Sequence, residues 1–504
     1  MTRLHALLQT AALPALTEPA IIGVMLAYFA VVAGIGWWAS RQTRNASDFF
    51  VAGQGIGLFT MTIAAMSATL SGFAFIGGPG LVYTIGLGAV FIVLPLSLTN
   101  AQGAWVLAKR LRLLAEVRRV MTVPDAIGAR YRSPAAQGLA GVAIVIAVIG
   151  YMATNLLALG LVIDAVFRTG LSTGVWIGAG VTLAYSVGGG ILAGVYTDLF
   201  QGSVMALASL LVFVFVLQVG GGMDGISTSI LASDPAVLSP WGKITPLAAL
   251  SFFFVFGIGA LGQPHVVHKF YMLRDVRKLK WYPLVMTAAM SVTLLLFIGV
   301  GLAVKALVLR GDLPPLARPD DATPVFLMRF APVWLAGLVF AGVAAAIMST
   351  VNAFMSVGAA ALTHDIPTGL GRRVHDELRA GRLATVAITL VSTLVAVQSG
   401  TLVAFLGVFG WGLFASTLVP ALAIGLNWAG ATRQGAIASI VTGLVVTLVF
   451  ETLAWWKVFT FPAGVTATAL ALVSSIGMFI AISCWTRADA PSQIDDDIRA
   501  VMEA

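Results

Sequence analysis

The sequence predicts an all-α polytopic membrane protein. Of its 504 residues, 59% are hydrophobic and only 10% are charged, and the mean hydropathy is +0.97. Apolar runs of about 20 residues, the length that an α-helix needs to cross a bilayer, recur along the whole chain. The basic residues fall mainly in alternate loops between these runs, as they do in proteins that cross a membrane many times.

Thirteen membrane-spanning helices are predicted from the apolar runs. Their expected ranges are 20–40, 54–78, 81–108, 136–166, 172–190, 194–219, 246–264, 281–308, 332–362, 383–399, 401–427, 434–453 and 463–485. The segment 1–18 precedes the first helix and contains a short apolar run interrupted by Pro14. We expect it to be a short extracytoplasmic segment rather than a signal peptide.

The distribution of Lys and Arg predicts the orientation in the membrane. The loops after odd-numbered helices, together with the C-terminal tail, hold 21 of the 29 basic residues. Cytoplasmic loops retain such residues, so the N-terminus is expected outside and the C-terminus in the cytoplasm, in a plasma or bacterial inner membrane. The net charge of +8 is spread over many short loops, which argues against a nucleic-acid partner and leaves the lipid bilayer as the expected surroundings.

No segment is long enough to form a separate soluble domain. The longest polar stretches lie at 109–135, 220–244, 309–331 and 363–382, and in the tail 486–504. None of them could bury a core of its own, which disfavours a sensor with an output domain. The end of the tail, "QIDDDIRAVMEA", is expected to be a short cytosolic helix or a solvated end.

The sequence does not favour an enzyme. It contains no nucleophile elbow, no phosphate-binding loop and no HExxH zinc motif. The histidines all lie in predicted loops or at the rims of the membrane. His265 and His268 have a spacing that a metal pair can use, but no Asp, Glu or Cys accompanies them at ligand spacing, so we expect solvated rim residues.

The second apolar run contains a segment that a membrane helix normally avoids, "SATLSGFAFIGGPG" at 67–80. Irregular backbone is tolerated at membrane depth only where it lines a cavity or a binding site. We expect the helix to break at Ser71 and Gly72, where glycine can adopt backbone conformations that a side chain would penalise, and to stop at the glycine run 77–80. The freed carbonyl groups of Ser67 and Leu70 would then point into the bundle.

A second polar cluster lies in the ninth predicted helix, in "AIMST". The carbonyl group of Ala346 and the hydroxyl groups of Ser349 and Thr350 share one helix surface. With the two carbonyl groups of the second helix they provide five neutral oxygens. Hard cations take oxygen ligands, and an uncharged set suits weakly bound Na⁺ better than Ca²⁺.

The chain is expected to contain an inverted repeat. The seventh helix is interrupted like the second, with Gly257, Gly259 and Gly262 ahead of Pro264. The two broken helices open two five-helix blocks, and because five is odd the second block enters from the opposite side, as in many transporters. The predicted organisation is the first helix and its loop at 19–53, the repeats at 54–219 and 245–427, two C-terminal helices at 428–485, and the tail 486–504.

Five motifs in order give the sequence a resemblance to the sodium:solute symporter family, nearest to its sodium/proline branch. They are "SDFFVAGQGIG", the "SG" pair, "GGGILAGVYTDLFQG", "GQPH" and "AAAIMST", and they cover nearly the whole chain. The resemblance implies a LeuT-type fold with one extra N-terminal and two extra C-terminal helices, and Na⁺ as the coupling ion. The implied sodium ligands are the backbone oxygens of Ser67, Leu70 and Ala346 and the hydroxyl groups of Ser349 and Thr350.

The same resemblance places Asp198 on the inner ion route, with a solvated carboxylate at the membrane rim as the alternative. The candidate solute-binding residues are Ser71, Gly72, Phe73, Tyr151, Asn155, Phe256, Ala260 and Gln263. Thr69, Phe73 and Ala260 depart from the pattern of the proline branch, so one aromatic wall is expected to be missing. No Arg or Lys lies within a predicted helix near these residues, so a solute carboxylate would face the ends of the broken helices.

The sequence therefore predicts a Na⁺-coupled symporter that imports a small organic solute, with an amino acid or related carboxylate favoured. A sugar, polyol or vitamin remains the alternative among transported solutes. A channel or sensor without coupled turnover is the alternative from another class, and two broken helices favour alternating access over an open pore. The sequence does not predict the oligomeric state.

Overall fold

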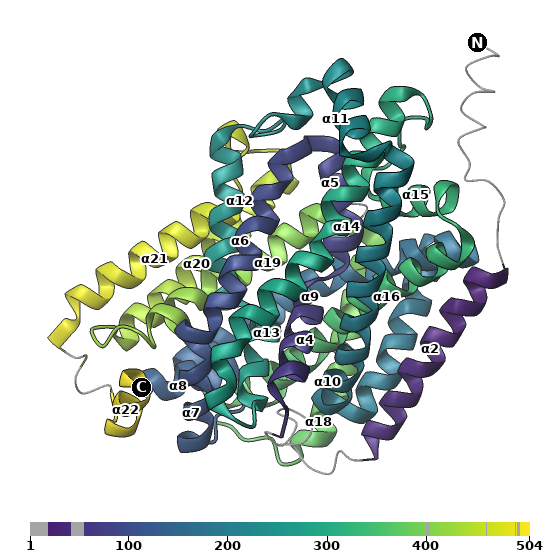
Figure 1. Ribbon diagram of the computed structural model, residues 1–504. Coiled ribbons are helices and arrows are strands. Elements are labelled where there is room, and N and C mark those ends of the chain that lie inside the picture. The colour runs from purple at the N-terminus through teal and green to yellow at the C-terminus, as the bar shows by residue number, and fades with distance from the viewer. Residues whose placement is uncertain (1–18, 42–54, 400–402, 460, 489, 491–493) are drawn as a thin grey trace.

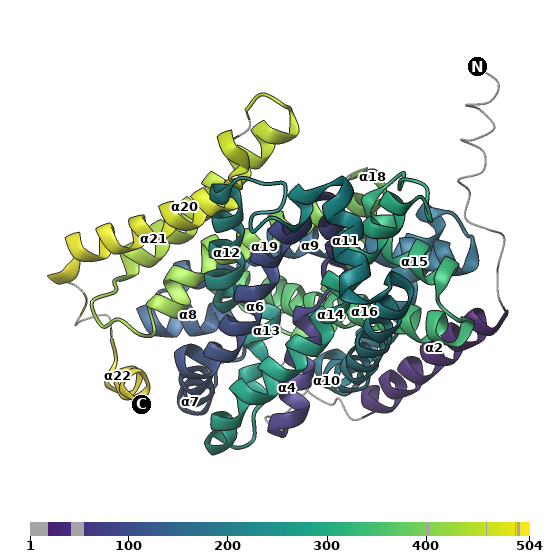
Figure 2. The ribbon, with the colours of Figure 1, turned by 45° about the horizontal axis from the view of Figure 1, so that its top comes forward.

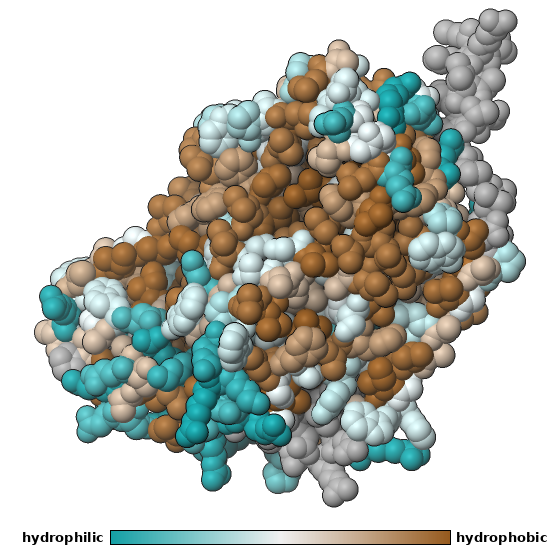
Figure 3. Space-filling model, in the orientation of Figure 1, coloured by the Kyte–Doolittle hydropathy of each residue, from teal (hydrophilic) through white to brown (hydrophobic). Residues whose placement is uncertain are grey.

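The computed structural model describes residues 19–41, 55–399, 403–459, 461–488, 490 and 494–504 (Figure 1). The predicted N-terminal segment 1–18 lies outside them. The described chain is helical throughout, which confirms the predicted all-α membrane fold. An apolar band crosses the space-filling surface between two polar ends (Figure 3). The end that carries the base-rich helix α7 (Lys109–Arg118) is called the basic end below.

The elements of the first repeat follow helix α2 (Pro19–Ser40). They are α4 (Leu58–Thr69), the π-helix η2 (Phe73–Gly77), α5 (Gly78–Ile85), the 3₁₀-helix η3 (Gly86–Ala89), α6 (Val90–Gly103), η4 (Ala104–Ala108), α7, α8 (Val123–Tyr131), α9 (Pro134–Phe167) and α10 (Leu171–Gly220). Helix α11 (Gly222–Ser233) and η5 (Pro235–Leu238) connect this repeat to the second one.

The second repeat begins with α12 (Pro246–Gly259). It continues with η6 (Ala260–Gly262), α13 (Pro264–Val267), η7 (His268–Met272), η8 (Val276–Trp281), α14 (Tyr282–Arg310), η9 (Pro319–Asp321), α15 (Ala322–Phe330), α16 (Val333–Ala360), η10 (Ala361–Asp365), α17 (Ile366–Gly369), α18 (Glu377–Ser399), α19 (Val403–Val419) and η11 (Pro420–Ile424). The C-terminal elements are α20 (Arg433–Trp455), η12 (Pro462–Gly464), α21 (Ala467–Trp485) and α22 (Asp496–Glu503).

The predicted count of thirteen spanning helices is not confirmed. Within the described residues, 10 helices are long and apolar enough to cross a membrane, or 11 when a bent pair in the second repeat counts as one span. Two further apolar helices, Leu58–Thr69 and Leu171–Ala184, are shorter. The first is short because its span is broken, and the second belongs to the 50-residue helix α10, which contains both predicted ranges 172–190 and 194–219.

Both predicted broken helices are present. Leu70, which follows α4, is extended with φ −88° and ψ 95°, and Gln263, between η6 and α13, is extended with φ −78° and ψ 101°. The two parts of the second broken helix, Pro246–Gly262 and Pro264–Met272, meet at an angle of 42°. The ends of the two broken helices also pair, because the N–H of Ile56 donates to Met272 O at 3.0 Å.

The expected stop at the glycine run 77–80 is wrong. The chain remains helical through η2 and α5 as far as Ile85. The glycines instead allow close packing, since a Cβ atom at Gly78 would lie 2.1 Å from the Phe297 ring and one at Gly80 2.6 Å from Pro319 O. Small residues let membrane helices approach each other in this way.

The predicted helix in the tail is confirmed, but it is not a free solvated end. Helix α22 lies beside α7 at the basic end (Figures 1 and 2), where Ile498 and Val501 are buried. The Arg118 guanidinium lies 2.5 Å from one oxygen of Asp497 and 2.6 Å from Asp495. This cation lowers the pKa of the Asp497 carboxyl group. The tail therefore docks on the membrane-spanning bundle.

Candidate sodium and solute site

Four of the five predicted sodium ligands, Ser67, Ala346, Ser349 and Thr350, lie close together where the first broken helix faces α16. The Ser67 hydroxyl donates to the Ser349 hydroxyl oxygen at 2.9 Å. The Thr350 hydroxyl lies 3.1 Å from the carbonyl oxygen of Ala68 and 3.0 Å from that of Ala346. Leu70, whose extended backbone ends α4, follows directly. The two elements thus bring hydroxyl and carbonyl oxygens from distant parts of the sequence to one buried place.

This place has the properties that a weakly held monovalent cation requires. Ser67, Leu70, Ala346, Ser349 and Thr350 are all fully buried. None of them carries a formal charge, and a hydroxyl group can turn its hydrogen aside to offer its oxygen to an ion. Oxygen ligands of this kind suit Na⁺.

The polar solute candidates meet on the other side of the same break. The N–H of Gly72 donates to Asn155 Oδ1 at 2.8 Å, and the N–H of Phe73 donates to Ser71 Oγ at 3.2 Å. The Ser71 hydroxyl lies 3.4 Å from the Tyr151 hydroxyl. Side chains from α9 and from the break itself therefore satisfy the N–H groups that begin the second half of the helix.

Gly72 is needed for a different reason from the one expected. Its φ of −53° and ψ of −29° are ordinary helical values that any residue adopts. A Cβ atom at this position would lie 2.6 Å from Ala158 Cβ and 3.0 Å from Ile347 Cγ1. Gly72 thus allows the broken helix to pack against α9 and α16, and backbone freedom is not the constraint.

Two of the candidate solute-binding residues, Phe73 and Phe256, belong to an aromatic stack. The rings of Phe73 and Phe256 are nearly parallel with centroids 5.7 Å apart. Phe256 in turn stacks on Trp411 of α19 at 5.3 Å, and Trp411 donates its indole N–H to Val255 O. Trp411 was not among the predicted residues, although the sequence offered one signal, a Trp between two glycines in "GWG". It supplies an aromatic surface where Ala260 led us to expect a missing wall.

Gln263 also joins this wall. Its side-chain amide donates to Gly259 O at 2.9 Å and to Trp411 O at 3.1 Å. Its Oε1 atom is buried and has no hydrogen-bond partner among the described residues. Ala260 is buried in η6, next to Gly259.

Asp198 is not a solvated rim residue. Its side chain is fully buried in α10, and its Oδ2 atom lies 2.6 Å from the Lys269 ammonium, which is only 1% exposed. Ser349, whose hydroxyl is one of the candidate sodium ligands, lies near the Asp198 carboxylate. Lys269 had been assigned to a cytoplasmic loop. The signal that could have predicted the pair was the acidic side chain of Asp198 within an apolar helix. A buried carboxylate needs an opposite charge nearby.

His265 and His268 are likewise buried, with 1% and 2% exposure, so the expectation of solvated rim histidines is wrong. The His265 ring packs 4.4 Å from the Phe354 ring of α16 and 6.3 Å from the Tyr151 ring. The two histidines follow the break at Gln263, His265 in α13 and His268 at the start of η7, where the chain bends by 42°.

Comparison with known proteins agrees with this architecture. The profile of the sodium:solute symporter family matches residues 49–443. The chain is 28% identical over 478 residues to the sodium/proline symporter of Haemophilus influenzae, which covers 90% of this chain and 94% of the relative. It is 26% identical over 431 residues to the osmoregulated proline transporter OpuE of Bacillus subtilis, covering 84% of this chain and 87% of the relative.

Solved structures share the fold. A Na⁺-coupled sialic acid symporter in a substrate-bound outward-open state superposes with a TM-score of 0.77 at 16% identity, covering 92% of this chain and 98% of the other. MhsT in complex with L-phenylalanine superposes with a TM-score of 0.53 at 13% identity, covering 85% and 98%.

The fold and the broken helices define a LeuT-type secondary transporter. The chain belongs to the sodium:solute symporter family, and it is a Na⁺-coupled transporter of a small organic solute rather than an enzyme.

We predict that Gly72→Leu abolishes Na⁺-driven uptake while the protein still inserts in the membrane. The added side chain meets Ala158 and Ile347 at the break, whereas Leu is compatible with membrane insertion. The matched control is Gly477→Leu in α21, where a Cβ atom meets nothing within 4 Å. Uptake is measured at equal expression, and normal transport by Gly72→Leu would show that close packing at the break is not required.

We also predict that Asp198→Asn lowers thermal stability, because it leaves the Lys269 ammonium buried without its counter-charge. Removing one partner of a buried ion pair costs about 3–5 kcal/mol. The double variant Asp198→Asn with Lys269→Gln is expected to recover most of the melting temperature. Asp234→Asn, which breaks the more exposed pairs with Lys243 and Lys305, serves as the control. Equal melting of the single and double variants would contradict this interpretation.

Proposed function

We propose that this protein imports an amino acid or a related small carboxylate together with Na⁺, with the ion held by Ser67, Leu70, Ala346, Ser349 and Thr350. The observation that carries the proposal is the contact between the first broken helix and α16 just before the break, where Ser67 contacts Ser349 and Thr350 contacts Ala68. Two of the relatives reported above are named as proline transporters or symporters, which supports a solute of this class.

The break couples the ion to the solute. Ser67 and Leu70 precede it and face the sodium side, while Ser71, Gly72 and Phe73 follow it and face Tyr151, Asn155 and the aromatic stack. Only a few residues of backbone separate the two sides. An ion that orders the carbonyl groups before the break therefore also fixes the N–H groups and the Phe73 ring after it, and each ligand favours binding of the other.

The proposed site suits a solute with an apolar body and a charged end. The stacked rings of Phe73, Phe256 and Trp411 make one side of the proposed site apolar. The hydrogen-bond partners of Ser71, Gly72 and Asn155 given above include no Lys or Arg. A solute carboxylate would instead use the N–H groups at the start of the second half-helix, whose dipole favours negative charge. The free Oε1 of Gln263 could accept a hydrogen from a solute amine.

Asp198 and Lys269 are proposed to line the exit of the ion. The pair lies next to Ser349, on the side of α13 and η7. A bare carboxylate beside the neutral site would hold Na⁺ strongly in this low-dielectric setting. The Lys269 ammonium compensates that charge, so the ion can leave. We further propose the N-out, C-in orientation, which is supported by the bases gathered around α7 and α22 at the basic end.

The ion site is tested by the double variant Ser349→Ala and Thr350→Ala, which removes two of the five oxygens. Contacts to a charge are worth about 1.5–3 kcal/mol each, so apparent Na⁺ affinity is expected to fall at least about tenfold. Ser356→Ala on the same helix, whose hydroxyl only bonds back to Asn352 O, is the matched control. Unchanged Na⁺ dependence in a folded double variant would remove these residues from the ion site.

The solute class is tested by uptake into proteoliposomes with and without an inward Na⁺ gradient. Labelled proline, other amino acids, carboxylates, sugars and polyols form the panel. We expect Na⁺-driven uptake of an amino acid or carboxylate, and we expect Phe73→Trp to change which solutes compete while leaving Na⁺ dependence largely intact. Uptake of a sugar or polyol alone would refute the proposed class. A shift in Na⁺ affinity without any change in solute preference would refute the role of Phe73.

A further inference from the structure

A second cluster of ionisable side chains lies at the basic end, outside the proposed transport site. It is formed by Asp125 of α8, His364 and Asp365 of η10, and Glu377 at the start of α18. His364 Nε2 lies 2.9 Å from Asp125 Oδ1, and His364 Nδ1 lies 3.2 Å from Glu377 Oε1. Gln137 Nε2 donates to one oxygen of each aspartate, so it holds the two carboxylates together.

The three groups Asp125, His364 and Asp365 are close enough to share one metal ion. Their potential ligand atoms all lie within 4.8 Å of one another. Two ligand atoms that each lie about 2.2 Å from one ion are at most about 4.4 Å apart. The ligand atoms of this cluster therefore need to move only slightly toward one another to bind the same ion. Within the described residues the carboxylates of the cluster have no Lys or Arg partner, and their ion pairs are both with His364.

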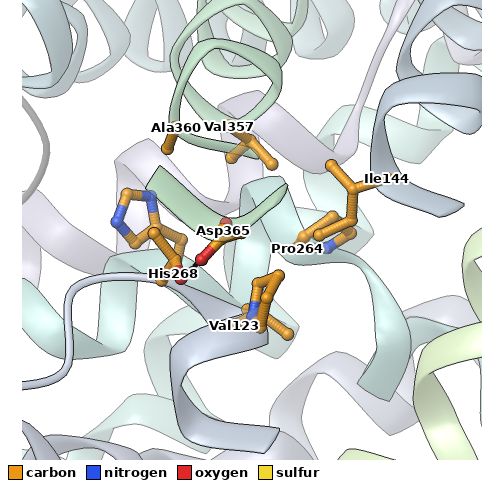
Figure 4. A pocket seen from close by; sticks show the side chains of 9 residues that line it. Val123, Ile144, Pro264, His268, Val357, Ala360 and Asp365 are labelled. Atoms are coloured by element: carbon orange, nitrogen blue, oxygen red, sulfur yellow. Dashed lines mark hydrogen bonds between the residues drawn. The ribbon is translucent and has the colours of Figure 1, made fainter. Parts of the chain in front are cut away.

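Asp365 gives a second, separate reason to place a ligand here. Its side chain is 1% exposed, and its Oδ2 atom is buried without any hydrogen-bond partner among the described residues. Its other oxygen accepts from the Thr122 hydroxyl at 2.7 Å. The Asp365 side chain also lines a small cavity with His268 and Thr122 (Figure 4). The cavity volume of about 10 Å³ is close to what one water molecule needs.

We propose that Asp125, His364 Nε2 and Asp365 form a binding site for a divalent transition-metal ion of the Zn²⁺ type, completed by one water molecule. Zn²⁺ binds mixed histidine and carboxylate ligands and often keeps a water in the fourth position. Glu377 takes the role of the carboxylate that accepts the other ring N–H of a metal-bound histidine and orients it. Mg²⁺ and Ca²⁺ prefer oxygen ligands alone and fit this set poorly.

The site joins the two repeats. Asp125 belongs to the first repeat, and His364 and Asp365 belong to the second. Alternating access requires the repeats to move against each other. A metal ion that bridges α8 and η10 therefore slows transport by holding their ends at the basic end together.

Binding is tested with ZnCl₂ on the purified full-length protein in lipid nanodiscs, by competition with a chromophoric chelator. We expect one Zn²⁺ per chain and no comparable binding of Mg²⁺ or Ca²⁺. His364→Gln and Glu377→Gln are each expected to weaken Zn²⁺ binding by about tenfold or more. The control is His375→Gln, which changes an exposed histidine in the loop between α17 and α18. We expect this variant to bind Zn²⁺ as the wild type does.

Transport provides the second readout. Zn²⁺ is expected to slow Na⁺-driven uptake by the wild type and by His375→Gln, and to have little effect on His364→Gln. Absence of saturable Zn²⁺ binding to the wild type, or equal binding by His364→Gln, would overturn the metal site. Binding that leaves uptake unchanged would overturn the bridge between the repeats. Uptake measured without Zn²⁺ tests the proposed transport function separately.

Discussion

The requirement that every backbone N–H and C=O group in a bilayer find a partner governs this structure. A break in a membrane helix frees several such groups, and each unsatisfied one costs several kcal/mol. At the first break the structure satisfies them with side chains from other helices. Asn155 of α9 accepts from Gly72, and Thr350 of α16 donates to Ala68 O. The residues that stabilise the break are thus the residues proposed to bind ion and solute.

Close packing of small residues brings the helices near enough for side chains to form these hydrogen bonds to the backbone at the break. A Cβ atom at Gly72 would collide with Ala158, one at Gly410 would lie 2.4 Å from Tyr151 Cβ, and one at Gly259 would lie 3.0 Å from Trp411 Nε1. Each of these glycines brings a wall of the site within hydrogen-bond or ring contact of the break. Small residues drive helix association in membranes, where burial of apolar surface contributes little.

Much of the fold was predictable from the sequence, and so was the approach of Ser67 to the hydroxyl groups of the ninth predicted helix, because the signals are local. Apolar runs give the spans, glycine and proline give the breaks, and hydroxyl groups in "AIMST" mark an unusual helix face. Pairings between distant segments left no local signal. The contact of Lys269 with Asp198, the stacking of Trp411 on Phe256 and the docking of α22 on α7 all depend on tertiary packing. The role of Gly72 was misjudged for the same reason, since its constraint comes from Ala158 and Ile347.

Burial of a charged group costs free energy, and the two buried aspartates Asp198 and Asp365 are accommodated in different ways. Asp198 is neutralised by a buried ammonium group, which keeps it from binding the ion tightly beside a site made of neutral oxygens. Asp365 has no Lys or Arg partner among the described residues and keeps one oxygen without a hydrogen-bond partner, next to Asp125 and His364. A transported ion must be released in every cycle, so a compensated carboxylate suits its route. An ion that only holds two elements together does not have to leave, and a carboxylate without a Lys or Arg partner suits that purpose.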